Sequence, residues 1–317
     1  MSMENAEQTP KHISVLLDEC IDNLNIRPDG IYLDGTLGMG GHSFEIASRL
    51  SAGRLICIDR DETAIARAGR RLAPFGDKVT LVHGNFSDAA AILDSLKIEG
   101  VDGMLFDLGV SSPQLDEADR GFSYMVQAPL DMRMDQGGSL TAYEVINTWT
   151  EDRLNRILWD YGEERYARRI TGAILKHREE KPIETTQELV DIIRSAMPAA
   201  ALREKQHPAK RTFQAIRIAV NDELGAIASM METAPDKLNR GGRLCVISFH
   251  SLEDRIVKSG IQAREHGCTC PREAPVCTCG FRQTLRSVYR KPILPTEEEI
   301  ERNPRARSAK LRVAERV

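Results

Sequence analysis

The sequence predicts an α/β fold of the class I, Rossmann-like type, with a parallel, doubly wound sheet and a helical insertion. Three observations predict it. Short apolar runs alternate with segments of helical periodicity through the N-terminal third of the chain. Three of these runs end in an acid, at Asp34, Asp59 and Asp107. A glycine-rich loop follows the first run, as in sheets that bind ligands at the carboxyl ends of their strands.

The predicted strands and helices alternate regularly up to residue 108. Buried strands are expected at the apolar runs 31–34, 54–59, 79–83 and 101–108. Helices are expected between them, at 43–50, 62–72 and 87–96. A further apolar run at 243–249 is expected to return the chain to the same sheet.

A long segment without strand patterns interrupts this alternation. Its helical patterns lie at 141–149, 151–161, 165–178, 186–197 and from residue 212 onward. We therefore expect a discontinuous α/β domain formed by residues 1–112 and 217–317. Residues 113–216 are expected to form an inserted helical domain.

The bulk composition limits the classes of protein to which the chain can belong. A net charge of −4 argues against a uniformly basic surface for nucleic acid. A local basic segment at 203–217 still allows RNA binding, although a solvated surface is the alternative. No apolar run reaches the roughly 18 residues that a membrane helix needs, and the first residues do not resemble a secretory leader. A cytoplasmic location without membrane contact is the expectation.

The glycine-rich loop, residues 33–43, reads L-D-G-T-L-G-M-G-G-H-S. A dinucleotide fingerprint starting at Gly38 would need glycine where Ser43 stands, and no Lys-Ser/Thr pair completes a P-loop. Asp59 follows about 20 residues later, where a carboxylate can accept hydrogen bonds from ribose hydroxyls. This pattern suits NAD and S-adenosylmethionine equally. A helix N-cap is the alternative for Asp59, although Asp61 is the better candidate for that cap.

The segment after the fourth strand, residues 107–114, reads D-L-G-V-S-S-P-Q. One reaction that this segment can serve is methyl transfer to an exocyclic amine of cytosine or adenine. The lone pair of such an amine is delocalised into the ring, so acceptors around its N–H groups must aim that lone pair at the methyl donor. Asp107 and the hydroxyls of Ser111 and Ser112 can supply acceptors for an in-line approach at about 3 Å. This chemistry requires no metal. The alternative is a structural turn formed by Ser-Ser-Pro.

Four cysteines gather near the C-terminus, at Cys268, Cys270, Cys277 and Cys279. Four thiolates so close in sequence can hold a tetrahedral zinc ion, although C-x-C pairs differ from the usual C-x-x-C spacing. Reduced loop thiols are the alternative. A zinc ion here would be structural, stabilising a loop with little core of its own.

Several long stretches resemble one known family. They are H-I-S-V-L-L-D-E (12–19), Y-L-D-G-T-L-G-M-G-G-H-S (32–43), D-L-G-V-S-S-P-Q-L-D (107–116), R-G-F-S-Y (120–124), P-L-D-M-R-M-D (129–135), Y-G-E-E-R (161–165), H-P-A-K-R-T-F-Q-A-I-R-I (207–218) and S-F-H-S-L-E-D-R-I-V-K (248–258). In this order they cover nearly the whole chain. The chain resembles the bacterial 16S rRNA cytosine-N4 methyltransferase family, which acts on a cytidine of the decoding centre.

The resemblance implies a cofactor, a partner and a set of contacts. The cofactor is S-adenosylmethionine, and the partner is 16S rRNA within the small ribosomal subunit. The implied cofactor contacts are Gly40, Gly41, His42, Asp59, Phe86, Asp107 and Gln114. Phe86 follows the third strand, where its ring can flank an adenine; core packing is the alternative. The sequence leaves the oligomeric state open, including a homodimer.

The helical insertion is expected to help recognise RNA. A target cytosine must leave its stack, so the site needs stacking rings and polar contacts. The stacking candidates are Phe122 and Tyr124, and the polar or phosphate candidates are Arg120, Asp131, Arg133, Lys210 and Arg211. For each, an ion pair or cap within the protein is the structural alternative.

Two other functions remain open at this point. The chain could methylate a small molecule or a protein, or it could be a non-catalytic RNA-binding factor on a methyltransferase fold. The insertion with Lys210 and Arg211 favours a large substrate. The complete glycine loop, Asp59 and Asp107 favour catalysis.

Overall fold

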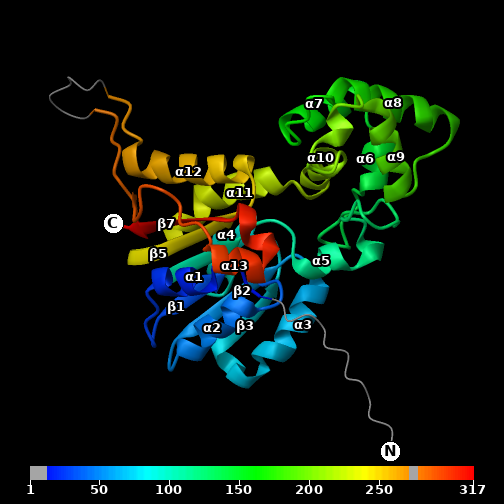
Figure 1. Ribbon diagram of the computed structural model, residues 1–317. Helices are drawn as coiled ribbons and strands as arrows, with labels where there is room; N and C mark the ends of the chain where they lie inside the picture. Colours follow the sequence, from blue (N-terminus) through cyan, green and yellow to red (C-terminus); the bar gives the residue numbers. More distant parts are fainter. Residues whose placement is uncertain (1–12, 271–277) are drawn as a thin grey trace, which may run out of the picture. The chain divides into compact units, whose positions relative to one another are not determined.

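The protein divides into two compact units in this computed structural model, which describes residues 13–270 and 278–317 (Figure 1). Unit 1 contains the described residues up to Leu108 and from Ile227 onward. Unit 2 contains Gly109–Ala226 and is slightly longer at both ends than the predicted insertion. Each unit is described by itself.

Unit 1 is built on a seven-stranded sheet in the order β3-β2-β1-β4-β5-β7-β6. The strands are β1 (Ile31–Asp34), β2 (Arg54–Asp59), β3 (Val79–His83), β4 (Val101–Asp107), β5 (Leu238–Ser248), β6 (Leu285–Ser287) and β7 (Lys310–Arg316). The first five are parallel, and β7 runs antiparallel to β5 and β6. The strand order reverses between β1 and β4, which is the point where such sheets bind ligands. This topology confirms the predicted class I fold.

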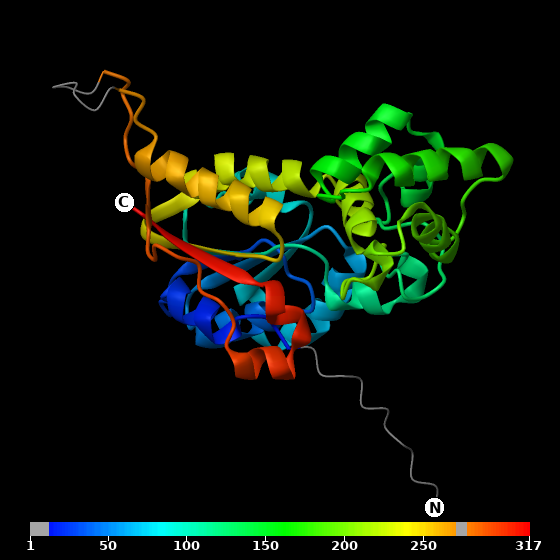
Figure 2. The same ribbon diagram turned by 45° about the horizontal axis from the view of Figure 1, so that its top comes forward.

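The parallel strands form where the sequence has continuous apolar runs, because helices cover both of their faces. In β2, four consecutive residues, Leu55–Ile58, are fully buried. Figures 1 and 2 show α11 and α12 on one face of the sheet and α1 and α2 on the other. Side chains from α1, α2 and α3 pack with β1 and β2 into one core cluster.

The helices of unit 1 include the three that periodicity predicts. These are α2 (Gly41–Arg49), α3 (Glu62–Leu72) and α4 (Ala89–Ser95). The others are α1 (Leu17–Leu24), the end of α11 (Glu223–Thr233), α12 (Ser251–His266) and α13 (Glu297–Arg302). Short 3-10 turns lie at Ala73–Lys78, Phe86–Asp88, Ala234–Lys237 and Pro304–Ser308.

The last strand, β7, brings basic residues of the C-terminal segment into the sheet. β7 pairs with β5 along six residues, and its Leu311, Val313 and Ala314 are buried. The arginines of this strand are neutralised locally, since Arg312 donates two hydrogen bonds to Asp254 at 2.6 and 3.1 Å.

Unit 2 is helical, and its helices lie close to where periodicity predicts them. They are α5 (Ser112–Asp116), α6 (Ala142–Thr148), α7 (Glu151–Asp160), α8 (Ala167–Glu180), α9 (Thr186–Ala196) and α10 (Lys210–Asn221), with 3-10 turns at Ala118–Arg120 and Ala201–Arg203. They enclose a single core cluster that includes Ile146, Leu158, Ile170, Ile193 and Ile216.

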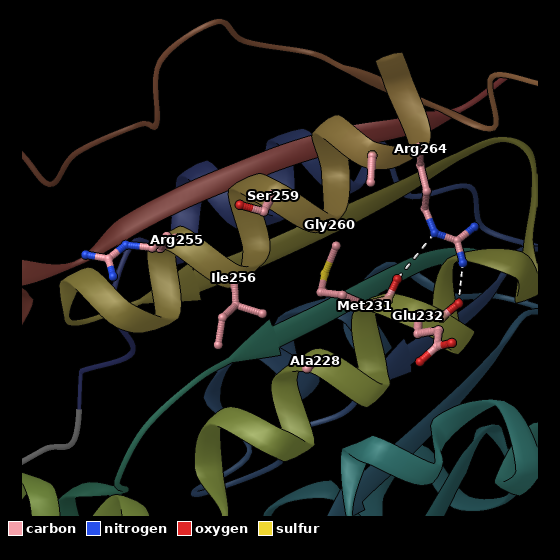
Figure 3. A pocket seen from close by; sticks show the side chains of 9 residues that line it. Ala228, Met231, Glu232, Arg255, Ile256, Ser259, Gly260 and Arg264 are labelled. Carbon is pink, nitrogen blue, oxygen red and sulfur yellow. Dashed lines mark hydrogen bonds between the residues drawn. The ribbon is translucent and has the colours of Figure 1, made fainter. Parts of the chain in front are cut away.

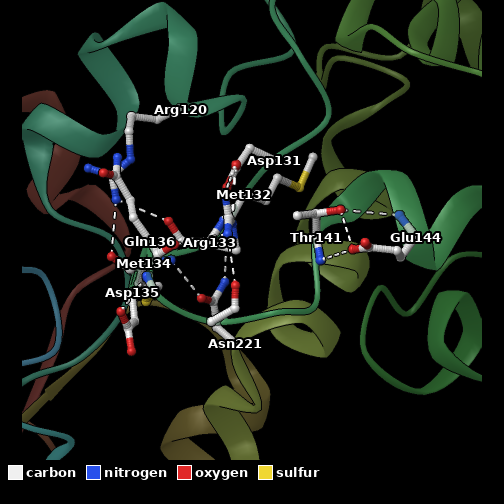
Figure 4. Close-up of polar contacts among 12 residues, drawn as sticks. Arg120, Asp131, Met132, Arg133, Met134, Asp135, Gln136, Thr141, Glu144 and Asn221 are labelled. Carbon is white, nitrogen blue, oxygen red and sulfur yellow. Dashed lines mark hydrogen bonds and ion pairs between the residues drawn. The ribbon is translucent and has the colours of Figure 1, made fainter.

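The loop before α6 is tied to α10 by one buried amide (Figure 4). Asn221 accepts the Met134 N–H at 2.8 Å and donates to the Met132 carbonyl at 2.7 Å. Thr141 caps α6 and exchanges hydrogen bonds with Glu144. These bonds satisfy backbone groups that would otherwise be unpaired in a buried loop.

Within the described parts of the chain, we find no helix of sufficient length and apolar character to cross a lipid bilayer.

Candidate active site

Three acids end neighbouring strands of the sheet. Asp34 ends β1 and lies in register with Cys57 of β2 and Leu105 of β4. Asp59 and Asp107 end those two flanking strands. Because parallel strands bring their carboxyl ends to one edge, all three acids lie at that edge. Asp34 and Asp107 flank the point between β1 and β4 where the strand order reverses, and Asp59 ends the next strand. The predicted position of these three acids at strand ends is confirmed.

The buried Asp34 carboxylate accepts hydrogen bonds from residues of the glycine-rich loop. It accepts the Ser43 hydroxyl at 2.6 Å and the Thr36 N–H at 3.1 Å. Burial raises the pKa of Asp34 to about 6, and the bond from Ser43 partly offsets that rise. Ser43, which separates the loop from a dinucleotide fingerprint, is therefore the hydroxyl that satisfies a buried acid.

Asp59 ties the loop to the second strand. Its two carboxylate oxygens accept the N–H of Gly38 at 2.7 Å and of Asp61 at 2.9 Å. Burial is the largest cause of the raised pKa of Asp59. The N-cap of α3 is Asp61, which accepts the Thr63 N–H at 3.0 Å. The prediction that Asp61 and not Asp59 caps this helix is confirmed.

Asp107 carries an acceptor oxygen to which no other described residue donates a hydrogen bond. Its N–H donates to the Thr36 hydroxyl at 2.6 Å, which fixes the backbone. Its Oδ1 is buried and has no hydrogen-bond partner among the described residues, yet a quarter of the side chain remains exposed. Burial, followed by the negative charges of Asp34 and Glu253, raises the pKa of Asp107 to about 8. An unsatisfied, desolvated carboxyl at a strand end is a strong candidate for contact with a ligand.

The residues 40–42 begin the helix beside these acids. Gly40 is the N-cap of α2 with φ 70°, a left-handed conformation that suits glycine, and Gly41 is the first helical residue. His42 is buried, with Nε2 3.1 Å from the Val15 carbonyl and Nδ1 4.0 Å from Asp107. The N-terminus of α2 therefore lies close to Asp107, at the acidic edge of the sheet.

Two phenylalanine rings border the start of the loop. Phe86, half-buried at the turn after β3, meets the buried Phe106 edge to face at 6.0 Å between ring centroids. Gly35 lies against both residues, because a Cβ at this position would lie 2.3 Å from the Phe106 ring and 3.3 Å from the Phe86 Cβ. Phe86 therefore leaves part of its ring exposed at the third strand end, where the sequence predicts a wall for a flat base.

Replacement of Gly35 by alanine should destabilise the protein. The added Cβ would overlap the Phe106 ring, which is fully buried and cannot move aside. Overpacking of this kind costs about 1–3 kcal/mol, so we expect a lower melting temperature and a smaller free energy of unfolding for Gly35→Ala. Gly172→Ala is the control, because nothing lies within 4 Å of a Cβ at that helical position. Equal stability of Gly35→Ala and the wild type would contradict the close packing.

Three predicted site residues belong to unit 2. Ser111 is the N-cap of α5, and its N–H donates to the Gln114 side chain at 3.0 Å in a capping box. Ser112 is the first residue of that helix, and Gln114 is buried. Their part in methyl transfer or cofactor binding stays a prediction, and the structure gives Ser111 and Gln114 a local role as well.

Four of the RNA-contact candidates have structural partners within unit 2: Arg120, Phe122, and Arg133 together with Asp131. Figure 4 shows the three polar ones. Arg120 is buried and donates to the carbonyls of Arg133 and Met134 at 3.0 and 3.1 Å. Arg133 forms a two-pronged ion pair with Asp131, whose shortest distance is 2.6 Å. Phe122 lies in the core. The RNA contacts of Arg120, Phe122 and Arg133 stay predictions, while their observed surroundings favour the structural alternative.

Tyr124 sits in an aromatic cluster that the sequence does not reveal. Its ring stacks on His207 at 4.5 Å between centroids and meets Phe213 edge to face. Burial, followed by the positive charge of Arg194, lowers the pKa of His207, and the Ala209 N–H donates to its Nδ1 at 3.2 Å. Met125, the next residue, is 71% exposed. Only aromatic residues in a polar loop hint at this cluster, because its members lie far apart in the chain.

Lys210 and Arg211 open α10. Lys210 is exposed, and Arg211 makes only a long contact of 3.5 Å with the Glu163 carbonyl. Of the predicted RNA contacts, these two basic side chains have the greatest freedom to meet a phosphate.

The turn after β5 differs from its predicted capping. The sequence suggests that Ser251 and Asp254 form the capping box of the following helix. The observed box is one residue earlier, at His250 and Glu253, and Asp254 instead binds Arg312. The buried Glu253 accepts the N–H of Phe249 at 2.7 Å. Its charge is one of the causes of the raised pKa of Asp107, so it lies near the acidic edge.

A cavity of about 690 Å³ lies away from these acids, between the C-terminal half of α11 and α12 (Figure 3). Its lining includes Ala228, Met231, Ile256 and Gly260. Arg264 borders it and donates to the Met231 carbonyl at 3.3 Å and to Asp236 at 2.7 Å. The lining has no acid from a strand end and no residue of the glycine loop. It is therefore a gap between two packed helices and not the site predicted from the sequence.

The strand-end site can hold a nucleoside that carries a positive charge. The Asp59 carboxylate can accept hydrogen bonds from sugar hydroxyls, and the Phe86 ring can flank a flat base. The open Oδ1 of Asp107 can accept a hydrogen bond from a second molecule. The acids at this edge would favour a cation over an anion.

Comparison with known proteins gives consistent results. A family model described as the MraW methylase family matches residues 9–317. A protein of Brevibacillus brevis named ribosomal RNA small subunit methyltransferase H is 57% identical over 307 residues, covering 96% of this chain and 98% of its own. A protein of the same name from Clostridioides difficile is 55% identical, with 96% and 99% coverage. A solved structure described as a putative rRNA methylase from Clostridium thermocellum matches with a TM-score of 0.45 and 12% identity, covering 96% of this chain and all of that one.

Proposed function

This chain belongs to the MraW methylase family, and we propose that it methylates N4 of a cytidine in the decoding centre of 16S rRNA. At the coarser level it is a methyltransferase of small-subunit ribosomal RNA, and its methyl donor is S-adenosylmethionine. The base, its position and the roles of individual residues are the content of the proposal. The observation that carries it is the open, desolvated Asp107 carboxyl at the end of β4.

The residues at the strand ends suit the donor. S-adenosylmethionine supplies an electrophilic methyl group on a positively charged sulfur. Asp59 would hold the ribose hydroxyls, and Phe86 would flank the adenine. Gly40, Gly41 and His42 would line the donor along the start of α2, where glycine leaves room for close approach.

Asp107 would position the acceptor amine. An ionised carboxylate accepts a hydrogen bond from an N4–H group and so turns the nitrogen lone pair toward the methyl carbon. The N–C bond forms as the S–C bond breaks, and the electron pair of the broken bond stays on sulfur. The methylated amine then loses the N4 proton, for which Asp107 is the nearest base in this proposal. A pKa raised to about 8 suits a group that must hold a proton briefly near neutral pH.

Unit 2 would recognise the RNA. Its Tyr124–His207 stack and exposed Met125 offer apolar and aromatic contact to an unstacked base. Lys210 and Arg211 offer charge to the phosphate backbone. Ser111, Ser112 and Gln114 remain proposed contacts in the same unit.

Salt dependence tests the proposed phosphate contacts. We expect Lys210→Ala and Arg211→Ala each to weaken binding of 16S rRNA without regard to sequence, and to lower the slope of log affinity against log salt by about one. Lys176→Ala is the control, since Lys176 is equally exposed on α8 but is not a predicted contact. Filter binding across a salt series measures the slope. Unchanged slopes for both variants would remove Lys210 and Arg211 from the interface.

Methyl transfer from radiolabelled S-adenosylmethionine tests the function itself. Free 16S rRNA, assembled small subunits and total cell protein are offered separately, and labelled RNA is digested to nucleosides. We expect label in ribosomal RNA alone, recovered as N4-methylcytidine. Label in protein, or in another nucleoside, would contradict the proposal. An absence of transfer to every substrate by a protein that binds the donor would favour a non-catalytic factor.

A further inference from the structure

A cluster of thiols lies outside the strand-end site, beyond the end of α12. Residues 267–270 follow α12, and residues 278–284 precede β6. We call these two described segments the legs of the cysteine arm (Figure 2). The legs are joined at their base, where the Thr284 N–H donates to the Arg264 carbonyl at 3.0 Å. The Phe281 ring covers Gly267, since a Cβ there would lie 2.8 Å from it.

Beyond this base the arm has almost no apolar packing. Cys268, Thr269 and Cys279 are exposed, and no residue of the arm is in the buried core among the residues that the structure describes. A loop of this kind pays a conformational entropy cost with little burial to offset it. A cross-link between its legs would remove much of that cost.

Three thiols converge from the two legs. The sulfur atoms of Cys268, Cys270 and Cys279 all lie within 4.8 Å of one another. Those of Cys268 and Cys279 are 3.6 Å apart, and the Thr278 N–H donates to the Cys270 sulfur at 3.2 Å. Cys277, the fourth member of the predicted set, lies outside the described residues.

These separations match a metal site better than a disulfide. Zinc–sulfur bonds of 2.3 Å at tetrahedral angles place the sulfurs about 3.8 Å apart. The observed spacing brackets that value, while a disulfide needs about 2.05 Å. The backbone bond to Cys270 would in addition stabilise a thiolate, which is the form that binds the metal.

We propose that Cys268, Cys270 and Cys279 bind a structural zinc ion that joins the two legs of the cysteine arm. The ligands come from both legs of the arm, Cys268 and Cys270 from one and Cys279 from the other. The site is separate from the strand-end acids, so its role is to hold the arm in shape and not to take part in methyl transfer.

Metal analysis of the whole protein, purified without chelators, tests the proposal. We expect about one zinc per chain for the wild type. Cys268→Ser and Cys279→Ser should each lower the zinc content at least about tenfold, because a structural site tolerates no loss of a thiolate. Thr269→Ala, between two of the ligands, is the matched control and should keep its zinc. Replacement by cobalt should give thiolate-to-metal charge-transfer bands that both serine variants lack.

Folding and the methyltransferase site are checked independently of the metal. The serine variants should bind S-adenosylmethionine with unchanged affinity, which shows that a loss of zinc is not a loss of fold. A wild type without zinc would overturn the proposal, as would an iron–sulfur cluster or a Cys268–Cys279 disulfide found by non-reducing peptide mapping. Retention of full zinc by both serine variants would overturn it as well. None of these outcomes depends on which nucleoside is methylated.

Discussion

Asp107→Ala lowers the rate of methyl transfer by roughly 10²–10⁴-fold in our account, while the protein stays folded. The side chain supplies an open acceptor at the end of β4, and the fold does not depend on it. Its Oδ1 has no hydrogen-bond partner among the described residues, and the bond to Thr36 uses the backbone N–H. Single-turnover transfer to 16S rRNA measures the loss. Binding of S-adenosylhomocysteine should change only slightly. Near-normal turnover would exclude the proposed role.

The pH dependence of the same residue gives a second readout. The pKa of Asp107 is raised to about 8, so the carboxyl is largely neutral at pH 6 and ionised above pH 8. Because the ionised form is the acceptor, kcat/KM of the wild type should rise with pH toward 8. In Asp107→Asn the residual rate should lack this rise.

The free energy of unfolding of the wild type should fall with rising pH, whereas kcat/KM should rise. A raised pKa means that the folded protein holds this proton more tightly than the unfolded chain does. Protonation of Asp107 therefore contributes to the free energy of unfolding at low pH, and the wild type loses this contribution as pH rises from about 4 to about 8. The melting temperature of Asp107→Asn relative to wild type should increase across this range. A constant difference would show that the carboxyl does not titrate in this window.

Asp59→Ala weakens donor binding by roughly 10–100-fold in our account, equivalent to about 1.4–2.8 kcal/mol. The carboxylate would accept the ribose hydroxyls, and it also holds Gly38 of the loop at 2.7 Å. Because the ribose is common to substrate and product, affinities for S-adenosylmethionine and S-adenosylhomocysteine should fall together. Isothermal titration calorimetry measures both.

Asp61→Ala is the matched control for this prediction. Asp61 is a neighbouring acid that would not touch the donor, and its side chain caps the N-terminus of α3. Loss of this cap costs about 1 kcal/mol of stability. We expect a lower melting temperature with unchanged donor affinity. If Asp59→Ala and Asp61→Ala lowered the affinity for the donor equally, the lower affinity would reflect a loosened loop and not a lost ribose contact.

Much of the sheet could be predicted because its strands are buried on both faces. The run 54–59 has four consecutive apolar residues, 55–58, and ends in an acid, and it forms β2 with the same bounds. β7 could not be predicted as easily. Its sequence K-L-R-V-A-E-R alternates between apolar and charged residues, but a short alternation among arginines also fits an exposed tail. Pairing with β5, a tertiary contact, makes it a strand.

The candidate site could be predicted where its residues end strands, and less well elsewhere. Asp59 and Asp107 follow apolar runs, so topology alone brings them to one edge. Burial of a side chain by tertiary packing could not be predicted in the same way. Arg120 and Phe122 appear as surface candidates in the sequence, whereas both are buried in unit 2. The stack of His207 on Tyr124 depends on how α10 meets the loop before α6, and no local pattern encodes that meeting.

A crystal structure with bound S-adenosylmethionine tests the central claim most directly. We predict the adenosine beside Phe86, the ribose hydroxyls on Asp59, and the sulfur-borne methyl group facing the open oxygen of Asp107. Electron density for the donor between α11 and α12, or none at the ends of β1, β2 and β4 at a saturating concentration, would contradict the account.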